Sequence, residues 1–168
     1  MNQFTFADHL HPMILLSMNT GLRRGEIFSL KWENVSLERA LLTIEGAYAK
    51  SGKTRHIPLN SEAISVLKEW RRQTDSSDLV FHNKDGLRFD NIKNGWATIL
   101  NAAKIKNFRW HDLRHHFASR LVMSDVDLNT VRELLGHSDM SMTLRYAHLA
   151  PEHKANAVEK LVTNNSNR

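Results

Sequence analysis

Residues 111–146 read HDLRHHFASRLVMSDVDLNTVRELLGHSDMSMTLRY, and this stretch points to the class of fold. Polar capping residues and a glycine divide it into helices. The predicted helices are residues 111–123, a helix capped by Asp127 or Asn129 that ends at Gly136, and a short helix capped by Ser141 that holds Tyr146. The last third of the chain is therefore predicted to be helical.

The same stretch carries side chains that together indicate phosphate chemistry. His111 and Arg114 are three residues apart on a predicted helix, so both lie on one face and can bind a single phosphate. His137 and Tyr146 follow. A phenol has a pKa of about 10 and is a poor nucleophile at neutral pH, so it needs neighbours that accept its proton and neutralise phosphate oxygens. Taken singly, each residue also has an ordinary structural explanation, such as a polar helix face.

Upstream of this stretch, helical periodicity alternates with a short β-region. The predicted helices are residues 8–19, 24–30, one capped by Asn60 and Ser61, one capped by Asp90, and a last one that begins at Pro151, with residues 32–35 forming a helical turn or a loop. Residues 41–47 and 54–59 are predicted to pair as a hairpin around Ser51-Gly52, and residues 79–81 to form a third short strand. The fold class is therefore α+β, mostly helical with a small antiparallel sheet.

Composition limits the kind of protein further. The chain has 168 residues, which fits one domain, and it contains no cysteine. Neither a signal pattern at Met1 nor a long apolar run is present in the sequence. The net charge is +5 and the isoelectric point is about 9.7, which favours a polyanionic partner such as nucleic acid.

Several motifs, spread over most of the chain, resemble the catalytic domain of tyrosine recombinases, the phage-integrase family. They are Thr20-Gly21-Leu22-Arg23-Arg24-Gly25-Glu26, Lys50 before Ser51-Gly52, His111-Asp112-Leu113-Arg114-His115, Leu135-Gly136-His137-Ser138 and Tyr146-Ala147-His148. Their order and spacing match the family, including the nine residues from His137 to Tyr146. The resemblance implies an integrase-type catalytic domain with a three-stranded antiparallel sheet.

The resemblance also implies a role for each matching residue. Arg23 and Arg114 look like the two arginines that bind the non-bridging oxygens of the scissile phosphate, and Tyr146 resembles the nucleophile. Lys50 resembles the hairpin lysine that protonates the departing 5′ oxygen, and the register of Ile57-Pro58 favours it over Lys53. The remaining matches are His111 for proton transfer, His137 as a hydrogen-bond donor to the phosphate, and Glu26 as the supporting acid.

By the same resemblance, the expected activity is site-specific DNA recombination, by integration or excision. Cleavage and rejoining of DNA would pass through a 3′-phosphotyrosyl intermediate, without a metal or cofactor. Double-stranded DNA is the expected partner, with Lys53, Arg55 and Arg109 as candidate DNA contacts. The chain is expected to be a monomer in solution and a tetramer on DNA through residues 151–162. A cytoplasmic, nucleoid-associated protein encoded by a bacterium or phage fits these expectations.

The expected domain limits are residues 1–162 for the catalytic domain and residues 163–168 for a flexible tail, with no upstream core-binding domain in this chain. A departure from the family is His116, where relatives often have threonine, and only a packing difference is expected from it.

Three alternatives compete with recombination. A non-catalytic DNA-binding remnant is disfavoured because all seven expected site positions are occupied. A type IB topoisomerase-like enzyme shares the chemistry, but the Leu-Gly-His and Tyr-Ala-His contexts favour a recombinase. A metal hydrolase is disfavoured because the ten histidines are scattered and no His-Glu-x-x-His spacing occurs.

Overall fold

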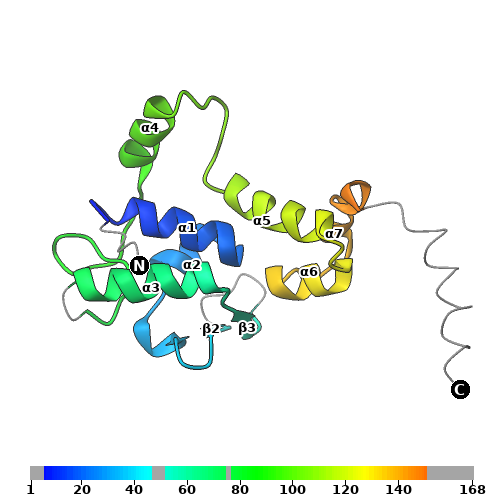
Figure 1. Ribbon diagram of the computed structural model, residues 1–168, viewed down its shortest axis with the longest axis horizontal. Coiled ribbons are helices and arrows are strands. Elements are labelled where there is room, and N and C mark those ends of the chain that lie inside the picture. The colour runs from blue at the N-terminus through cyan, green and yellow to red at the C-terminus, as the bar shows by residue number, and fades with distance from the viewer. Residues whose placement is uncertain (1–5, 47–51, 75–76, 151–168) are drawn as a thin grey trace, which may run out of the picture.

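The computed structural model of this chain describes residues 6–46, 52–74 and 77–150 (Figure 1). Helices dominate this part of the chain, and most predicted elements are confirmed with shifted ends. In chain order the elements are α1 (Leu10–Thr20), α2 (Arg24–Phe28), η1 (Trp32–Asn34), β1 (Val35–Ser36), β2 (Leu41–Ile44), β3 (Arg55–Pro58), α3 (Ser61–Gln73), α4 (Lys93–Ala102), α5 (Asp112–Met123), α6 (Leu128–Leu135), α7 (Ser141–Leu144) and η2 (Ala147–Leu149). The predicted helix from Pro151 lies outside the described residues.

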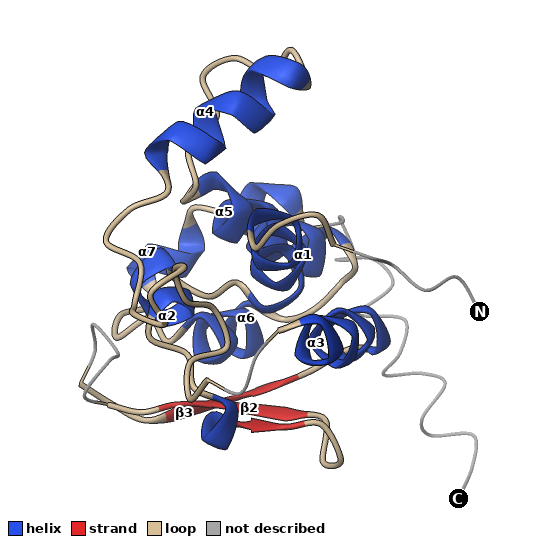
Figure 2. Cartoon of the chain, turned by 90° about the vertical axis from the view of Figure 1, so that its left-hand side faces the viewer, coloured by secondary structure: helices blue, strands red, loops and turns tan. Residues whose placement is uncertain are grey.

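The sheet is antiparallel, with the order β1-β2-β3. Leu42 in its centre is opposite Val35 on one side and Ile57 on the other, and all three side chains are buried. Burial alternates along β2 and β3, as expected for strands that cover a core with one face. Figure 2 shows the α-helices gathered on one side of this sheet.

The prediction of the third strand was wrong. The third strand is β1, whereas residues 79–81 run beside residues 30–32 and form an isolated bridge between Leu79 and Lys31. Val80 and Phe81 are completely buried in this position. A short apolar run can thus satisfy its burial as an extended core segment without joining the sheet.

Two predicted helix caps are confirmed and two are wrong. Asn60 caps α3 by accepting a hydrogen bond from the Ala63 N–H at 2.9 Å, and Asp127 caps α6 by accepting one from the Thr130 N–H at 2.9 Å. Asp90 does not cap α4, which begins after Ile92 without a side-chain cap. Ser141 is the first residue of α7 rather than its cap, and Tyr146 follows that helix instead of lying within it.

The buried apolar residues form two clusters that meet along α5. The larger one joins α1, α2, α3 and the sheet and includes Leu113, while the smaller one begins at Phe117 and includes Leu135 and Tyr146. Gly21, which ends α1 at a φ of 63°, sits against both α5 and α6, since a Cβ there would lie 2.4 Å from Phe117 and 3.1 Å from Leu135. This close approach brings the residues after α1 to the same place as α5 and α6.

Candidate active site

One cavity of about 490 Å³ collects most of the predicted site residues. It opens where the beginning of α2 meets α5, the end of α6 and α7. Its lining consists of Arg23, His111, Arg114, His115, His137, Ser141, Met142, Arg145 and Tyr146. Five of the six predicted catalytic residues therefore share one cavity, and the sixth, Lys50, lies outside the described residues.

Arg114 lies at the base of this site and is only 3% exposed. Its guanidinium donates hydrogen bonds to the carbonyl of Gly21, at 2.6 Å, and to the carbonyl of Leu135. Both carbonyls belong to helix ends, whose partial negative charge stabilises a cation. Burial and the nearby charge of Arg23 lower the pKa of Arg114 to about 9, which still leaves it charged at neutral pH.

Arg23 lines the same cavity. Glu26 holds it twice, because its carboxylate accepts from the Arg23 backbone N–H at 2.8 Å and from Nη1 at 3.0 Å. Nη2 donates to the carbonyl of Gly136 at 3.4 Å. Arg23 and Arg114 are thus both fastened at the end of α6, and together they place two positive charges beside the cavity.

Glu26 is a buried carboxylate with a second partner, Arg55. The two form a bidentate ion pair, with Nη1–Oε1 and Nη2–Oε2 distances of 2.9 and 2.7 Å, and they are 2% and 8% exposed. Burial alone would raise the pKa of Glu26, but the hydrogen bonds and charge of Arg55, together with Arg23, hold it below its ordinary value.

This geometry corrects the expectation that Arg55 contacts DNA. Its guanidinium is buried against Glu26, and its Nε donates to the carbonyl of Leu134 at 3.3 Å. Arg55 therefore links β3 to α2 and α6 instead of facing a ligand. Sequence reasoning had no local signal for this pairing, because the partner lies 29 residues away.

Gly136 leaves room for Arg55. It has a φ of 63°, and a Cβ at this position would lie 2.8 Å from Cδ of Arg55. A side chain here would therefore meet both an unfavourable backbone conformation and a packed arginine. This explains why a glycine precedes His137.

Gly136→Ala is expected to lower the free energy of unfolding by more than Gly86→Ala does. Both glycines have a positive φ, 63° and 75°, so both variants carry a cost of about 1–2 kcal/mol for the left-handed backbone. Only at Gly136 would the new methyl group also collide with Arg55, because Gly86 has no atom within 4 Å of the added Cβ. Urea unfolding of the two variants measures the difference, and equal losses would contradict the packing role.

His137 is held by a residue that sequence reasoning missed. Its Nδ1 lies 2.9 Å from the hydroxyl of Thr143, and Thr143 is completely buried. A threonine that donates to Nδ1 leaves the imidazole proton on Nε2, which is then a donor. Burial, followed by the charges of Arg114 and Arg23, lowers the pKa of His137 to about 4, so the ring is neutral at neutral pH.

The protein is expected to lose stability as the pH falls from 6.5 towards about 4. In this range the unfolded chain binds a proton at His137, whereas the folded chain does not, so acid favours unfolding. His137→Asn should weaken this pH dependence, and His56→Asn, a change at an exposed position of β3, should leave it intact. Urea midpoints measured across this pH range test the prediction, and identical slopes for all three proteins would refute it.

Tyr146 is 6% exposed, and its hydroxyl contacts His115. The distance from Oη to Nδ1 of His115 is 2.6 Å. Burial raises the pKa of the phenol, and the charges of Arg145 and Arg114 oppose this only in part. His115 was not among the predicted site residues, although its position four residues after His111 places it on the same helix face. The two histidine rings are 4.9 Å apart, edge to face.

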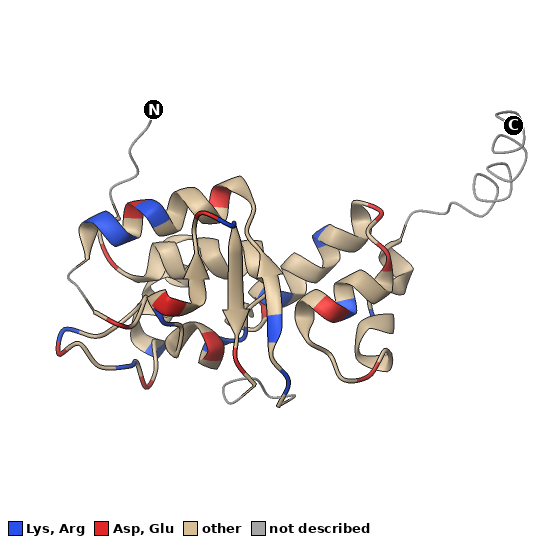
Figure 3. Cartoon of the chain, turned by 90° about the horizontal axis from the view of Figure 1, so that it is seen from below, with Lys and Arg blue, Asp and Glu red and all other residues tan. Residues whose placement is uncertain are grey.

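The remaining DNA-contact candidates lie at the edges of the cavity. Lys53 lines a neighbouring hollow of about 260 Å³ together with Arg132, His137 and Ser138. Arg109 is 80% exposed and pairs with Asp112 at 3.5 Å. Figure 3 shows that acidic and basic segments are interspersed on the face that it presents, so net charge alone does not locate a binding surface.

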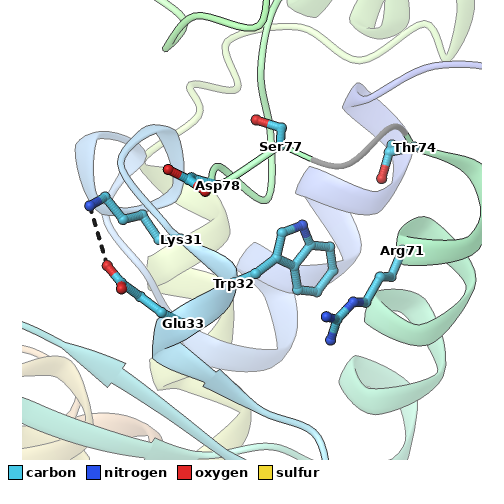
Figure 4. A pocket seen from close by; sticks show the side chains of 7 residues that line it. All are labelled: Lys31, Trp32, Glu33, Arg71, Thr74, Ser77 and Asp78. Carbon is cyan, nitrogen blue, oxygen red and sulfur yellow. Dashed lines mark hydrogen bonds and ion pairs between the residues drawn. The ribbon is translucent and has the colours of Figure 1, made fainter.

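A separate cavity of about 450 Å³ has a different character (Figure 4). Its lining is Lys31, Trp32, Glu33, Arg71, Thr74, Ser77 and Asp78. Lys31 pairs with Glu33 at 3.2 Å, and the guanidinium of Arg71 lies 5.1 Å from the ring centre of Trp32. The charges are mixed and no histidine or tyrosine takes part, so this cavity does not match the predicted chemistry.

No three His, Asp or Glu side chains among the described residues lie close enough to hold a metal ion together. None of their helices is long and apolar enough to cross a membrane.

Sequence comparison now identifies the family. Residues 3–153 match the profile of the phage integrase family. The chain belongs to the phage integrase family. The resemblance seen in the sequence motifs is thereby confirmed, and the cavity described above holds five of the residues that carry it in this phage integrase family member.

Relatives of this family member include phage, bacterial and archaeal proteins. The integrase of Salmonella phage P22 is 33% identical over 158 residues, which are 87% of this chain and 41% of the relative. The tyrosine recombinase XerA of Pyrococcus furiosus is 33% identical over 156 residues, 88% of this chain and 53% of the relative. The chain thus spans about half the length of these relatives.

Solved structures agree with this family assignment. The catalytic domain of bacteriophage HP1 integrase superposes with a TM-score of 0.70 at 26% identity, covering 89% of this chain and 80% of that one. The XerH recombinase bound to difH substrate, in a pre-cleavage complex, has a TM-score of 0.70 at 28% identity, covering 88% and 45%. The predicted integrase-type catalytic fold is confirmed.

Proposed function

We propose that this phage integrase family member cleaves and rejoins DNA in site-specific recombination, by integration or excision. The observation that carries the proposal is the position of Tyr146, whose hydroxyl shares one cavity with Arg23 and Arg114. Tyr146 attacks a backbone phosphate, forms a 3′-phosphotyrosyl bond and releases a 5′ hydroxyl. The 5′ hydroxyl of a partner strand then reverses this step. The bond energy is retained in the intermediate, so no ATP is consumed.

The two arginines supply most of the transition-state stabilisation in this proposal. Negative charge grows on the phosphate oxygens as Tyr146 attacks, and donors that are already fixed in place stabilise it without reorganisation. Arg114 and Arg23 are fixed by the ends of α1 and α6 and by Glu26. In this scheme the two guanidiniums do the work that a metal ion does in other phosphoryl-transfer sites.

The other site residues have separate tasks. His137 donates to a phosphate oxygen through Nε2, with Thr143 holding the ring in that tautomer. His111, which is exposed at the beginning of α5 and lines the cavity, assists proton transfer. Lys50 protonates the departing 5′ oxygen from the hairpin. Glu26 positions Arg23 and, through Arg55, connects it to the hairpin strand β3.

Double-stranded DNA is the proposed partner, and the complexes of XerH with its difH substrate support this choice. Exposed Arg109 and Lys53 provide non-specific phosphate contacts beside the cavity. The protein is a monomer in solution in this proposal, and residues 151–162 mediate its assembly into a tetramer on DNA. Its proposed location is the nucleoid in the cytoplasm. Deletion of residues 155–168 should weaken assembly on DNA in a gel-shift experiment, and unchanged assembly would refute this role.

A pool of nicked duplexes with randomised sequence around the nick tests the proposed chemistry. Incubation with EDTA, followed by SDS and protease digestion, should recover a peptide containing Tyr146 joined to a 3′ nucleotide, which mass spectrometry identifies. Sequencing of the captured DNA gives the preferred site. Adducts that need a divalent metal, or that form at another residue, would overturn the proposal. Strand exchange between two captured duplexes separates recombination from simple relaxation of supercoiled DNA by a topoisomerase-like enzyme.

A further inference from the structure

Tyr146 and His115 form a short contact, and His115 has no role in the mechanism proposed above. His115 Nδ1 lies 2.6 Å from the phenol oxygen, within ordinary hydrogen-bond distance. Neither ring is freely exposed, since Tyr146 is buried and His115 is half-buried in the lining of the cavity. The phenol oxygen of Tyr146, which would attack the phosphate, is thus already hydrogen-bonded to an imidazole nitrogen that can take its proton.

We propose that His115 is a catalytic base for the attack, accepting the proton of the Tyr146 hydroxyl at Nδ1 and returning it when the strand is rejoined. This inference rests on the proposed DNA cleavage. It assigns the removal of the Tyr146 proton to Nδ1 of His115.

The protons and bonds balance in this step. During cleavage the Oη–H bond of Tyr146 breaks and an Nδ1–H bond forms on His115, while the Oη–P bond forms and the P–O5′ bond breaks. The 5′ oxygen takes its proton from a separate donor, which is Lys50 in the proposed mechanism. On rejoining, the incoming 5′ hydroxyl gives its proton back to the neutral amine of Lys50 as the O5′–P bond forms. The Oη–P bond breaks, and the imidazolium of His115 returns its proton to Oη, so both groups end as they began.

The charges around His115 favour the basic form before the reaction. Burial and the positive charge of Arg145 lower the pKa of His115 below its ordinary value of 6.5, with smaller effects in the same direction from Arg109 and Arg114 and an opposing one from Asp112. The groups that face the ring are Arg145 and Tyr146 after α7, Arg109 before α5, and His111, Asp112 and Arg114 around the first turn of α5. The ring is therefore neutral at neutral pH.

A base is needed because the phenol is buried. Burial raises the pKa of Tyr146, so the hydroxyl does not ionise unaided at neutral pH. Once His115 has taken the proton, Asp112 stabilises the resulting imidazolium, since its negative charge raises the pKa of this ring. The carboxylate of Asp112 is fixed by the Arg109 N–H at 2.8 Å.

The other two histidines that line the cavity have other contacts than the Tyr146 hydroxyl. Nδ1 of His137 is taken by Thr143, 2.9 Å away. His111 is exposed, and its ring and the His115 ring are arranged edge to face, with 4.9 Å between the ring centres. In the described part of the chain, the hydrogen bond of the Tyr146 hydroxyl is to His115.

A first experiment tests the contact without any DNA. Isotope-labelled nitrogen NMR of the histidine rings should show the proton of His115 on Nε2, because Nδ1 accepts from Tyr146. In Tyr146→Phe the His115 signals should shift, and those of His56, on the exposed face of β3, should not. A His115 ring that is unchanged by the loss of the hydroxyl would overturn the inference.

A second experiment tests the chemistry with the nicked duplexes captured from the randomised pool. The rate of covalent adduct formation should rise with pH through the titration of an imidazole and then level off. His115→Asn keeps an oxygen near the position of Nδ1 but cannot carry the proton, so its rate should fall by about 10²–10⁴-fold and lose this inflection. His56→Asn is the matched control and should behave as the unchanged protein does.

The outcomes separate the two proposals. Adduct formation by His115→Asn at the full rate with the same pH profile would overturn the base role while leaving DNA cleavage intact. Absence of adduct even with the unchanged protein would overturn the proposed function, which the NMR experiment does not depend on. Unfolding in urea checks that His115→Asn is folded, and His115→Gln serves as the second variant if it is not.

Discussion

Tyr146→Phe is expected to abolish adduct formation with nicked DNA completely and to leave the fold nearly unchanged. The substitution removes the attacking oxygen but keeps the ring, which is packed in the smaller of the two apolar clusters. Loss of the hydroxyl leaves Nδ1 of His115 without its 2.6 Å partner, at a cost of about 1 kcal/mol in the free energy of unfolding. Gel electrophoresis in SDS measures the adduct, and urea unfolding measures the stability.

Tyr48 is the matched control, because the chain has two tyrosines. Tyr48→Phe should form the adduct at Tyr146 as the unchanged protein does. Adduct formation that survives in Tyr146→Phe, or that disappears in Tyr48→Phe alone, would show that Tyr146 is not the nucleophile.

Arg55→Met is expected to produce the largest loss of stability among single substitutions around the site. Glu26 is 2% exposed and would lose its bidentate partner, which leaves a buried carboxylate whose remaining ion pair is with Arg23. Removing one partner of a buried ion pair typically costs about 3–5 kcal/mol, whereas methionine retains much of the packing. We expect a loss of about 3 kcal/mol, at the lower end, because Arg23 still contacts Oε1. Urea unfolding at neutral pH measures it.

The loss of stability in Arg55→Met should depend on pH in a definite direction. In the unchanged protein the pKa of Glu26 is lowered below its ordinary value of 4.5, so its stabilising effect is complete above that value and is lost as the pH falls through the folded pKa. Arg55→Met raises the pKa of Glu26, and protonation then relieves the buried charge. The difference in stability between the two proteins should therefore shrink as the pH falls.

Arg72→Met is the control for a charge removed from the surface. Arg72 pairs with Glu69 at 3.1 Å, but its side chain is 62% exposed. Its loss should change the free energy of unfolding by about 0–1 kcal/mol, with little dependence on pH. Comparable losses for Arg55→Met and Arg72→Met would mean that the Glu26 pair does not stabilise the fold.

Three arginines around Glu26 show how the folded protein tolerates several positive charges close together. Arg23, Arg55 and Arg114 come together around a single buried carboxylate, and the charges oppose one another. Carbonyl groups at the ends of α1 and α6 accept from Arg114, and the end of α6 also accepts from Arg23 and Arg55. Helix ends that stop at Gly21 and Gly136 therefore supply the negative potential that Glu26 alone does not.

Local features of the sequence were sufficient to predict most helices and the hairpin. Asn60 and Asp127 mark helix starts because a side chain that caps a helix acts on backbone three residues away. Gly21 and Gly136 mark helix ends because their backbone conformation is costly for other residues. The motifs that contain Arg23, Arg114 and Tyr146 identified the family for the same reason, since each motif is contiguous in the chain.

Tertiary packing alone decided the contacts that connect distant segments. Arg55 was expected on the DNA, but it pairs with Glu26 across 29 residues. The third strand proved to be Val35–Ser36, because the apolar run at residues 79–81 is buried without joining the sheet. His115 reaches Tyr146 across 31 residues. Spacing and capping are local properties of the chain, whereas these pairings depend on how α1, α5 and α6 pack, and only the folded structure fixes that packing.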